Sequence, residues 1–233
     1  MSADARAQSK TKIPPLRNGQ RLTRSEFMRR WEAMPELKFA ERIEGKVSIM
    51  SPPISLTEHG GPSFLISWIL AEYSMSTPGT IGFNESTVHI DGDNDFLPDV
   101  GLVVLPEFGG QTRRVGEYLA GAPELVVEVS NSSTVKDLGV KSIVYRRAGV
   151  LEYLVWQTRK KTIDCFINRE GQFEPAEIAD GIFKSRCFPG LWIDFAALVA
   201  GNLDKVRATS AAGLADPSHS KFKRKLAKAK RGG

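Results

Sequence analysis

The sequence predicts an α/β (α+β) fold in which short strands alternate with helices. The clearest strand is the apolar run Leu125–Val129, which has the character of a strand buried on both faces of a sheet. The segments Leu151–Trp156 and Thr162–Ile167 are separated by a short polar stretch and predict a β-hairpin. Between that strand and the hairpin, residues 134–148 have helical spacing, and Gly149 is placed to end the helix.

Length and composition are those of an ordinary globular protein. The chain has 233 residues, 41% of them hydrophobic and 25% charged, so it can bury a core. No apolar run approaches the roughly 20 residues of a transmembrane helix, and the N-terminus lacks the apolar region of a signal peptide. The two cysteines, Cys165 and Cys187, are too few for a disulfide framework or a zinc site. These features predict a cytoplasmic protein without a membrane partner.

Positive charge is concentrated at the C-terminus. The net charge is +5, but Pro217–Gly233 alone contains seven basic residues and no acidic residue. The remainder of the chain is therefore slightly acidic, with a net charge of −2. Residues 204–233 are predicted to be a disordered, basic tail. Such a tail is most often a solvated extension, although it could add non-specific contacts to phosphate groups.

The first part of the chain is predicted to contain an arm, two helices and a hairpin. Residues 1–20 contain two adjacent prolines and scattered charges, which favour a flexible arm. A capping box of Thr23 and Glu26 is expected to start the first helix. A Glu44-Gly45 turn joins two short strands, and a second helix begins near Thr57.

The next part is predicted to be rich in strands, with one folded domain extending over residues 21–203. The strand-like runs before Leu125 are Ile81–Phe83, Ser86–Ile90 and Asp99–Leu105. The acidic segment Asp91–Asp95 is interpreted as a turn, because it lacks the glutamate that ends a calcium-binding loop. The polar, glycine-containing stretch 106–122 is expected to be a surface connection.

Two carboxylates occur in these apolar runs. Asp99 follows Pro98 at the start of one predicted strand, and Glu128 lies within another. Burial of an unpaired carboxylate is unfavourable, whereas Mg²⁺ and Mn²⁺ prefer carboxylate, carbonyl and water oxygens. Lys141, on the following helix, could orient or help deprotonate a water molecule, or neutralise charge on a phosphate. The three residues predict a metal site suited to phosphodiester hydrolysis.

A series of short motifs, each weak alone, is more specific in its order and spacing. The series is the Glu44-Gly45 turn with Met50-Ser51-Pro52, then His59, Leu97-Pro98-Asp99-Val100, Pro123–Ser130, Asp137 with Lys141 and Tyr145, and Gly149–Tyr153. In this respect residues 21–200 resemble the Uma2 family of predicted endonucleases, within the PD-(D/E)XK nuclease-like superfamily. The resemblance implies a restriction-endonuclease-like fold, with a mixed central β-sheet flanked by helices.

The resemblance also implies roles for individual residues. Asp99 and Glu128 would be metal ligands, and the carbonyl of Val129 a third. The superfamily commonly has a lysine two residues after the glutamate, where this chain has Ser130. Lys141 is the candidate to replace it, because family members supply the lysine from the next helix, and Lys136 is the alternative.

Three further residues are candidates for an accessory role. Glu44 could be an additional acid, since the superfamily often has one in this region, or it could simply support the turn before Gly45. His59 could donate to a phosphate or have a structural role at the start of its helix. Tyr145 is expected to be packed with its hydroxyl satisfied rather than to be catalytic.

The leading functional hypothesis is an endonuclease that depends on Mg²⁺ or Mn²⁺ and cuts nucleic acid, with DNA the expected substrate. A homodimer would suit cleavage of two strands. The alternative is a nucleic-acid-binding or interaction module that keeps the scaffold without turnover. A serine or cysteine hydrolase is disfavoured. The chain contains no Gly-x-Ser-x-Gly motif, and Cys165 lies in a predicted hairpin strand without an evident histidine partner.

Overall fold

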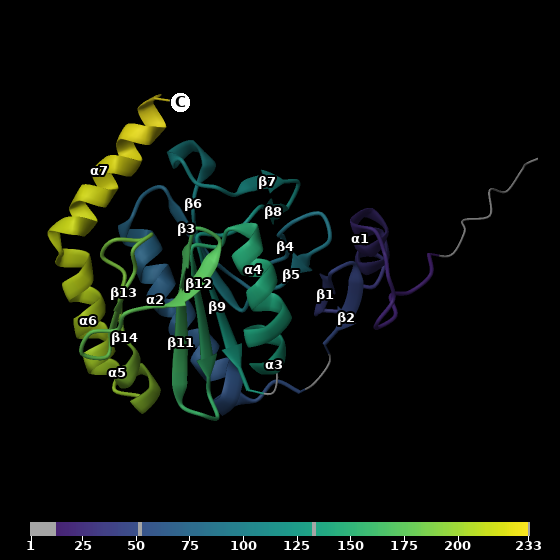
Figure 1. Cartoon of the computed structure of the whole chain (residues 1–233), viewed down its shortest axis with the longest axis horizontal. Helices are drawn as coiled ribbons and strands as arrows, with labels where there is room; N and C mark the ends of the chain where they lie inside the picture. Colours follow the sequence, from purple (N-terminus) through teal and green to yellow (C-terminus); the bar gives the residue numbers. More distant parts are fainter. Residues whose placement is uncertain (1–12, 51–52, 132–133, 233) are drawn as a thin grey trace, which may run out of the picture.

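A six-stranded mixed β-sheet forms the centre of the protein in the computed structural model, which describes residues 13–50, 53–131 and 134–232. Its strands are β3 (Thr80–Asn84), β6 (Val100–Val104), β9 (Leu125–Ser130), β10 (Glu152–Gln157), β11 (Thr162–Arg169) and β12 (Gln172–Pro175). They lie in the order β12-β11-β10-β9-β6-β3 (Figure 1). β9 and β10 are parallel, whereas the other neighbours are antiparallel. The predicted α/β class with a mixed sheet is confirmed.

A second six-stranded sheet contains the N-terminal hairpin. Its strands are β1 (Ala40–Ile43), β2 (Lys46–Ile49), β4 (Val88–His89), β5 (Asp95–Phe96), β7 (Arg113–Val115) and β8 (Tyr118–Ala120), in the order β2-β1-β5-β4-β8-β7. The last two strands lie in the stretch predicted to be a surface connection. These three-residue strands turn at Gly116 and are too short to produce a clear alternating pattern. A separate hairpin consists of β13 (Ile182–Lys184) and β14 (Trp192–Asp194).

Helices cover the main sheet and the N-terminal hairpin. They are α1 (Arg24–Glu32), α2 (Gly61–Ser76), α3 (Thr134–Lys136), α4 (Ser142–Ala148), α5 (Phe195–Ala200), α6 (Leu203–Ala215) and α7 (Pro217–Gly232), with π-helical turns η1 (Leu56–Gly60) and η3 (Asp137–Lys141) and the 3₁₀ turn η2 (Pro106–Phe108). Two predicted signals are confirmed: the Thr23 side chain caps α1, and Gly149 ends α4 with a φ of 97°. No described helix is long and apolar enough to cross a membrane.

Strand alternation divides the core between the two faces of the main sheet. Leu125, Val127 and Val129 of β9 pack on the face covered by α2. Val126 packs on the opposite face, together with Tyr145 of α4. Because side chains alternate along a strand, Glu128 lies on the same face as Val126. The helix that contains Tyr145 therefore covers this acid.

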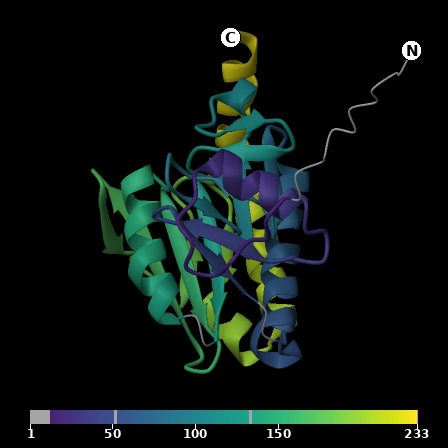
Figure 2. The ribbon, with the colours of Figure 1, turned by 90° about the vertical axis from the view of Figure 1, so that its right-hand side faces the viewer.

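The C-terminus is helical where the sequence predicted disorder. α6 and α7 pack along one side of the domain, and the C-terminal end of α7 lies at the top of the molecule (Figures 1 and 2). His219, Phe222 and Leu226 of α7 are buried. Their spacing of three and four residues is a helical apolar stripe, and the surrounding lysines obscure it in the composition. The predicted domain limit at residue 203 stays a prediction.

The described part of the N-terminal arm is also packed rather than flexible. Leu16 is buried in a small cluster with Phe27 and Val47. The backbone N–H of Gly19 donates to the carbonyl of Val47 at 2.7 Å. Residues 13–20 therefore belong to the folded domain, because one apolar side chain and a strand-edge hydrogen bond hold them there. The rest of the predicted arm lies outside the described residues.

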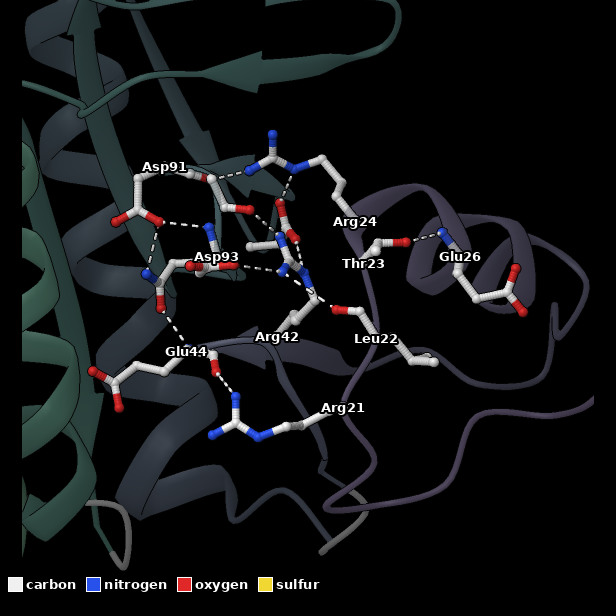
Figure 3. Close-up of polar contacts among 12 residues, drawn as sticks. Arg21, Leu22, Thr23, Arg24, Glu26, Arg42, Glu44, Asp91 and Asp93 are labelled. Carbon is white, nitrogen blue, oxygen red and sulfur yellow. Dashed lines mark hydrogen bonds and ion pairs between the residues drawn. The ribbon is translucent and has the colours of Figure 1, made fainter.

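A buried ion-pair network attaches β1 to β5. The guanidinium of Arg42 donates from Nε to Asp95 Oδ2 at 2.6 Å, and both side chains are almost completely buried. Asp95 Oδ1 accepts from Arg24 Nε at 2.6 Å and contacts His89 Nδ1 at 2.7 Å. Figure 3 shows Arg24 and Arg42 pointing toward the turn that contains Asp91 and Asp93. This network fixes the position of β1.

We expect Asp95→Asn to lower the free energy of unfolding by about 3–5 kcal/mol at pH 7, because it leaves the buried Arg42 guanidinium without its counter-charge. The matched control is Asp93→Asn, whose side chain is 79% exposed and lies 3.7 Å from Arg42; its effect should stay within about 0.5 kcal/mol. Urea denaturation of the three proteins measures both values. Equal losses would contradict this assignment.

The stability difference between wild type and Asp95→Asn should also depend on pH. Burial acts to raise the pKa of Asp95, but the hydrogen bonds from His89 and the two arginines lower it overall. The stabilisation is therefore complete above the pKa of unfolded aspartate, about 3.9, and is lost as the pH falls through the lower pKa of the folded state. Urea denaturation at intervals between pH 7 and pH 3 should show the difference narrowing below about pH 4.

Candidate active site

The structure brings Asp99 and Glu128 together where β6 begins and the adjacent strand β9 ends. β6 and β9 are antiparallel, with Val100 opposite Val127. Asp99 immediately precedes β6, whereas the sequence predicted that the strand would begin at Asp99 itself. Its Oδ2 accepts the backbone N–H of Val129 at 2.6 Å. The register of these strands therefore places both carboxylates beside one another.

Glu128 is held by two side chains from the helical segment that follows β9. Its Oε1 accepts from Lys141 Nζ at 2.7 Å and from the Tyr145 hydroxyl at 2.9 Å, and all three residues are buried. The helix is not regular there. It contains the π-helical turn η3, with non-helical backbone angles at Gly139. The expectation that Tyr145 is packed with a satisfied hydroxyl agrees with this geometry.

A second acid from a distant strand, Glu41 of β1, also contacts Lys141. Glu41 is fully buried, and its Oε1 lies 2.9 Å from Lys141 Nζ and accepts the backbone N–H of Leu97 at 3.1 Å. Its other oxygen bonds Lys136. Glu41 was not among the residues that the sequence motifs indicated. Alternation along the predicted strand, which places Glu41 on the same face as the apolar Ile43, was the available signal.

Glu44 is in the turn and outside this cluster. Its φ of 49° and that of Gly45, 77°, are both positive, as a two-residue hairpin turn requires. Its side chain is exposed, and Figure 3 shows it pointing away from the Arg42 network. The structure therefore supports a role for Glu44 in forming the turn rather than as an additional acid of the site. The acid that the hairpin contributes to the cluster is Glu41.

Asp137 and Ser130 lie behind the lysine. Asp137 Oδ1 is 3.8 Å from Lys141 Nζ, one helical turn earlier in the chain. The Ser130 hydroxyl donates to Asp137 Oδ2, and both residues are buried. Ser130, which stands where the family resemblance predicted a lysine, therefore bonds an acid beside Lys141.

His59 contacts the strand end from η1. Its Nδ1 is 2.9 Å from the carbonyl oxygen of Val129. A carbonyl can only accept, so Nδ1 carries the proton and a neutral ring has its lone pair on Nε2. Nε2 lies 3.6 Å from Asp99 Oδ1. The Val129 carbonyl, predicted as a metal ligand, thus already accepts a hydrogen bond.

These side chains line one pocket of about 140 Å³. Its polar lining consists of Ser55, His59, Glu85, Asp99, Glu128, Asn131, Lys136, Asp137 and Lys141, and its apolar lining includes Phe39 and Leu97. Ser51 and Pro52, part of the motif that precedes His59, lie outside the described residues. The pocket therefore gathers every predicted site residue except Glu44, Ser130 and Tyr145, and the last two bond to its lining.

Burial and charge set the protonation states in the pocket. Burial raises the pKa of Asp99 to about 6, although His59 and Lys141 oppose the shift. Burial likewise raises the pKa of Glu128 well above its usual value. For Lys141 burial acts in the opposite direction, but Glu128 and Glu41 raise its pKa well above the ordinary range. Lys141 is therefore an ammonium ion at any physiological pH.

The oxygen atoms of the cluster are of the type that divalent cations bind, but their present arrangement is not that of a metal site. Four acidic side chains (Glu41, Asp99, Glu128 and Asp137) face two lysines (Lys136 and Lys141). With every acid ionised, the cluster has a formal excess of two negative charges. Carboxylate oxygens are the ligands that Mg²⁺ and Mn²⁺ prefer. As the side chains stand, no three His, Cys, Asp or Glu residues among those described are arranged to hold a metal. The Lys141 ammonium instead occupies the position between Glu41 and Glu128.

The protein thus has a mixed α/β fold with a cluster of acids and lysines at one end of its main sheet. The family model of Uma2, described as "Putative restriction endonuclease", matches residues 24–196. The chain belongs to the Uma2 family. No curated protein matches the sequence.

A solved structure shares the fold. It is described as "a putative nuclease belonging to DUF820 from Anabaena variabilis ATCC 29413" and is similar with a TM-score of 0.57. The similarity covers 77% of this chain and 98% of that protein, at 17% sequence identity. At this identity the comparison establishes a common fold.

We expect Lys141→Met to lower the free energy of unfolding by about 3–5 kcal/mol, because it leaves two buried carboxylates without their shared counter-charge. Lys136→Met is the matched control. The Lys136 side chain is 24% exposed, and in this variant Glu41 would still be paired with Lys141. The free energy of unfolding should therefore fall by only about 1 kcal/mol. Guanidinium denaturation without divalent cations measures both. A smaller loss for Lys141→Met than for Lys136→Met would contradict the central position of Lys141.

Proposed function

We propose that this protein is a metal-dependent endonuclease that hydrolyses phosphodiester bonds in DNA. The observation that carries the proposal is the convergence of Asp99, Glu128 and Lys141 on one pocket, where β6 begins and β9 ends. The Uma2 family description supports the reaction class.

Asp99 and Glu128 would hold Mg²⁺ or Mn²⁺, with the Val129 carbonyl and the other two acids of the cluster nearby. When bound, the cation would supply Lewis-acid polarisation of a phosphate oxygen and a more acidic water molecule. Tyr145 fixes the rotamer of Glu128 through the bond to Oε1. His59 fixes the end of β9 through the Val129 carbonyl.

Lys141 would act as a fixed positive charge rather than as a base. Its raised pKa keeps the amine protonated, so it is a poor acceptor for a proton from water. An ammonium group held by two carboxylates can stabilise the negative charge that develops on a phosphate during in-line attack. Glu41 and Asp137 position it for this role.

Three further expectations belong to this proposal. The DNA preference rests on the family description, which names a restriction endonuclease. A homodimer would allow both strands of a duplex to be cut. A cytoplasmic location agrees with the two free cysteines, Cys165 and Cys187.

We expect purified protein with Mg²⁺ or Mn²⁺ to cleave plasmid DNA, and Asp99→Asn to reduce the rate by about 100-fold or more, because the variant loses an anionic ligand. Asp93→Asn, an exposed acid outside the pocket, is the matched control and should cleave normally. Calorimetric titration should detect Mn²⁺ binding to wild type and a weaker affinity for Asp99→Asn.

If wild type and Asp99→Asn are equally inert on plasmid, single-stranded DNA and RNA with either ion, the nuclease proposal fails. Oligonucleotide binding that persists without any Mn²⁺ binding would favour the alternative, a non-catalytic binding module. That alternative is compatible with the ammonium group at the centre of the carboxylates.

A further inference from the structure

Helix α7 presents a concentration of positive charge that its own surroundings do not neutralise. The helix contains seven lysine and arginine residues and no acidic residue. Six of these side chains are described, and five of the six are exposed, with Lys223 half-buried. Within the part of the chain that the structure describes, none of the six forms an ion pair with a carboxylate. The charge is therefore available to a ligand.

This arrangement is unfavourable for an isolated helix. Like charges recur at spacings of three and four residues, as in Lys221 with Arg224 and Arg224 with Lys228. Such pairs destabilise a helix by a few tenths of a kcal/mol each. Surface helices usually mix both signs of charge. A polyanion on this face would relieve the repulsion, whereas a neutral partner would not.

Contacts with the domain hold α7 in a fixed orientation. The Phe222 ring packs edge-on against Phe188 with centroids 6.4 Å apart. His219 Nε2 lies 2.8 Å from the Thr77 hydroxyl in the buried interior. Near the other end of the helix, Lys230 Nζ is 5.0 Å from the ring centroid of Phe108. The basic face is thus displayed on a rigid element, about 24 Å long for its 16 residues.

A groove beside α7 extends the basic surface onto the domain. It has a volume of about 640 Å³ and lies between α7 and the residues where β6 ends and where β9 and β10 begin. Arg186, Lys221 and Lys225 contribute three exposed cations to its lining. Glu124 is the one acid in the lining, and its carboxylate accepts the backbone N–H groups of Val104 and Gln111. Lysine and arginine side chains suit the oxygens of a phosphate chain.

The groove and the candidate active site lie at opposite ends of the same strands. Asp99 precedes β6 and lines the active-site pocket, whereas Val104 ends β6 and lines the groove. Five residues of extended strand separate them, about 17 Å. Figures 1 and 2 show α7 extending to the top of the molecule, whereas α3 is near the bottom in Figure 1. A ligand on α7 would not block the pocket.

We propose that α7 and its groove form a second, sequence-independent site for the phosphate backbone of duplex DNA, remote from the bond that is cut. This inference rests on the proposed function for the identity of its ligand. The site contributes affinity and contacts no reacting atom. Its strength depends on the release of counterions, so it weakens steeply as salt increases.

The test uses two double variants. The α7 variant combines Arg224→Gln and Lys228→Gln, and the control variant combines Lys46→Gln and Arg207→Gln. Both variants remove two exposed positive charges, and the second pair lies outside α7. Glutamine is a good helix former, and circular dichroism checks that the helix content is unchanged. Binding of a fluorescent 30-base-pair duplex is measured by anisotropy in EDTA at several salt concentrations, so no cleavage is required.

We expect the α7 variant to bind the duplex more weakly, with a slope of log K against log salt that is smaller by about 2, since each phosphate contact contributes about 0.9. The control variant should keep the wild-type slope. With Mg²⁺, the α7 variant should cleave plasmid with a raised KM and an unchanged kcat.

Equal slopes for all three proteins, or an equal decrease in both variants, would overturn the inference. Binding and cleavage are read separately, so the two proposals can fail independently. Absence of cleavage with a slope change confined to the α7 variant would reject the nuclease and retain the site. Cleavage by wild type with equal slopes would reject the site and retain the nuclease.

Discussion

The ammonium group of Lys141 is the interaction on which the rest of the candidate site depends. It lies between Glu128 of the main sheet and Glu41 of the second sheet, and all three groups are buried. A buried charge is tolerated when its partners are close and well oriented. The two sheets and the helix that contains Lys141 must therefore reach their positions together. One side chain thus couples folding of the domain to assembly of the pocket.

The Arg42–Asp95 pair supports this assembly from the other face of β1. Neighbouring side chains on a strand point to opposite faces, so Glu41 faces the pocket while Arg42 faces Asp95. The segment that begins with Asp95 continues to Leu97, whose N–H binds Glu41, and then to Asp99. The second sheet therefore contributes Glu41 to the site and fixes its position.

Charge is separated along the length of the molecule. The pocket has a formal excess of two negative charges and would attract a cation, whereas α7 is uniformly basic. A single net charge of +5 conceals both features. If the pocket were as basic as α7, it would compete with a metal for the phosphate. If α7 were acidic, it would repel the substrate. The separation allows one chain to hold a cation and a polyanion at different places.

Several features were determined by the sequence itself, because they depend on local chemistry. An acid inside the apolar run Leu125–Val129 marked Glu128 as a candidate, and the family resemblance marked Lys141 on the following helix, with Lys136 as the alternative. The caps at Thr23 and Gly149 were also predictable from local backbone requirements. Tertiary structure decided that Glu41 rather than Glu44 reaches the lysine, because strand pairing places one in the core and the turn exposes the other. It also ordered α7, whose three buried side chains are stabilised by contacts with distant residues such as Thr77 and Phe188. Local sequence cannot show those contacts, since they form between segments far apart in the chain.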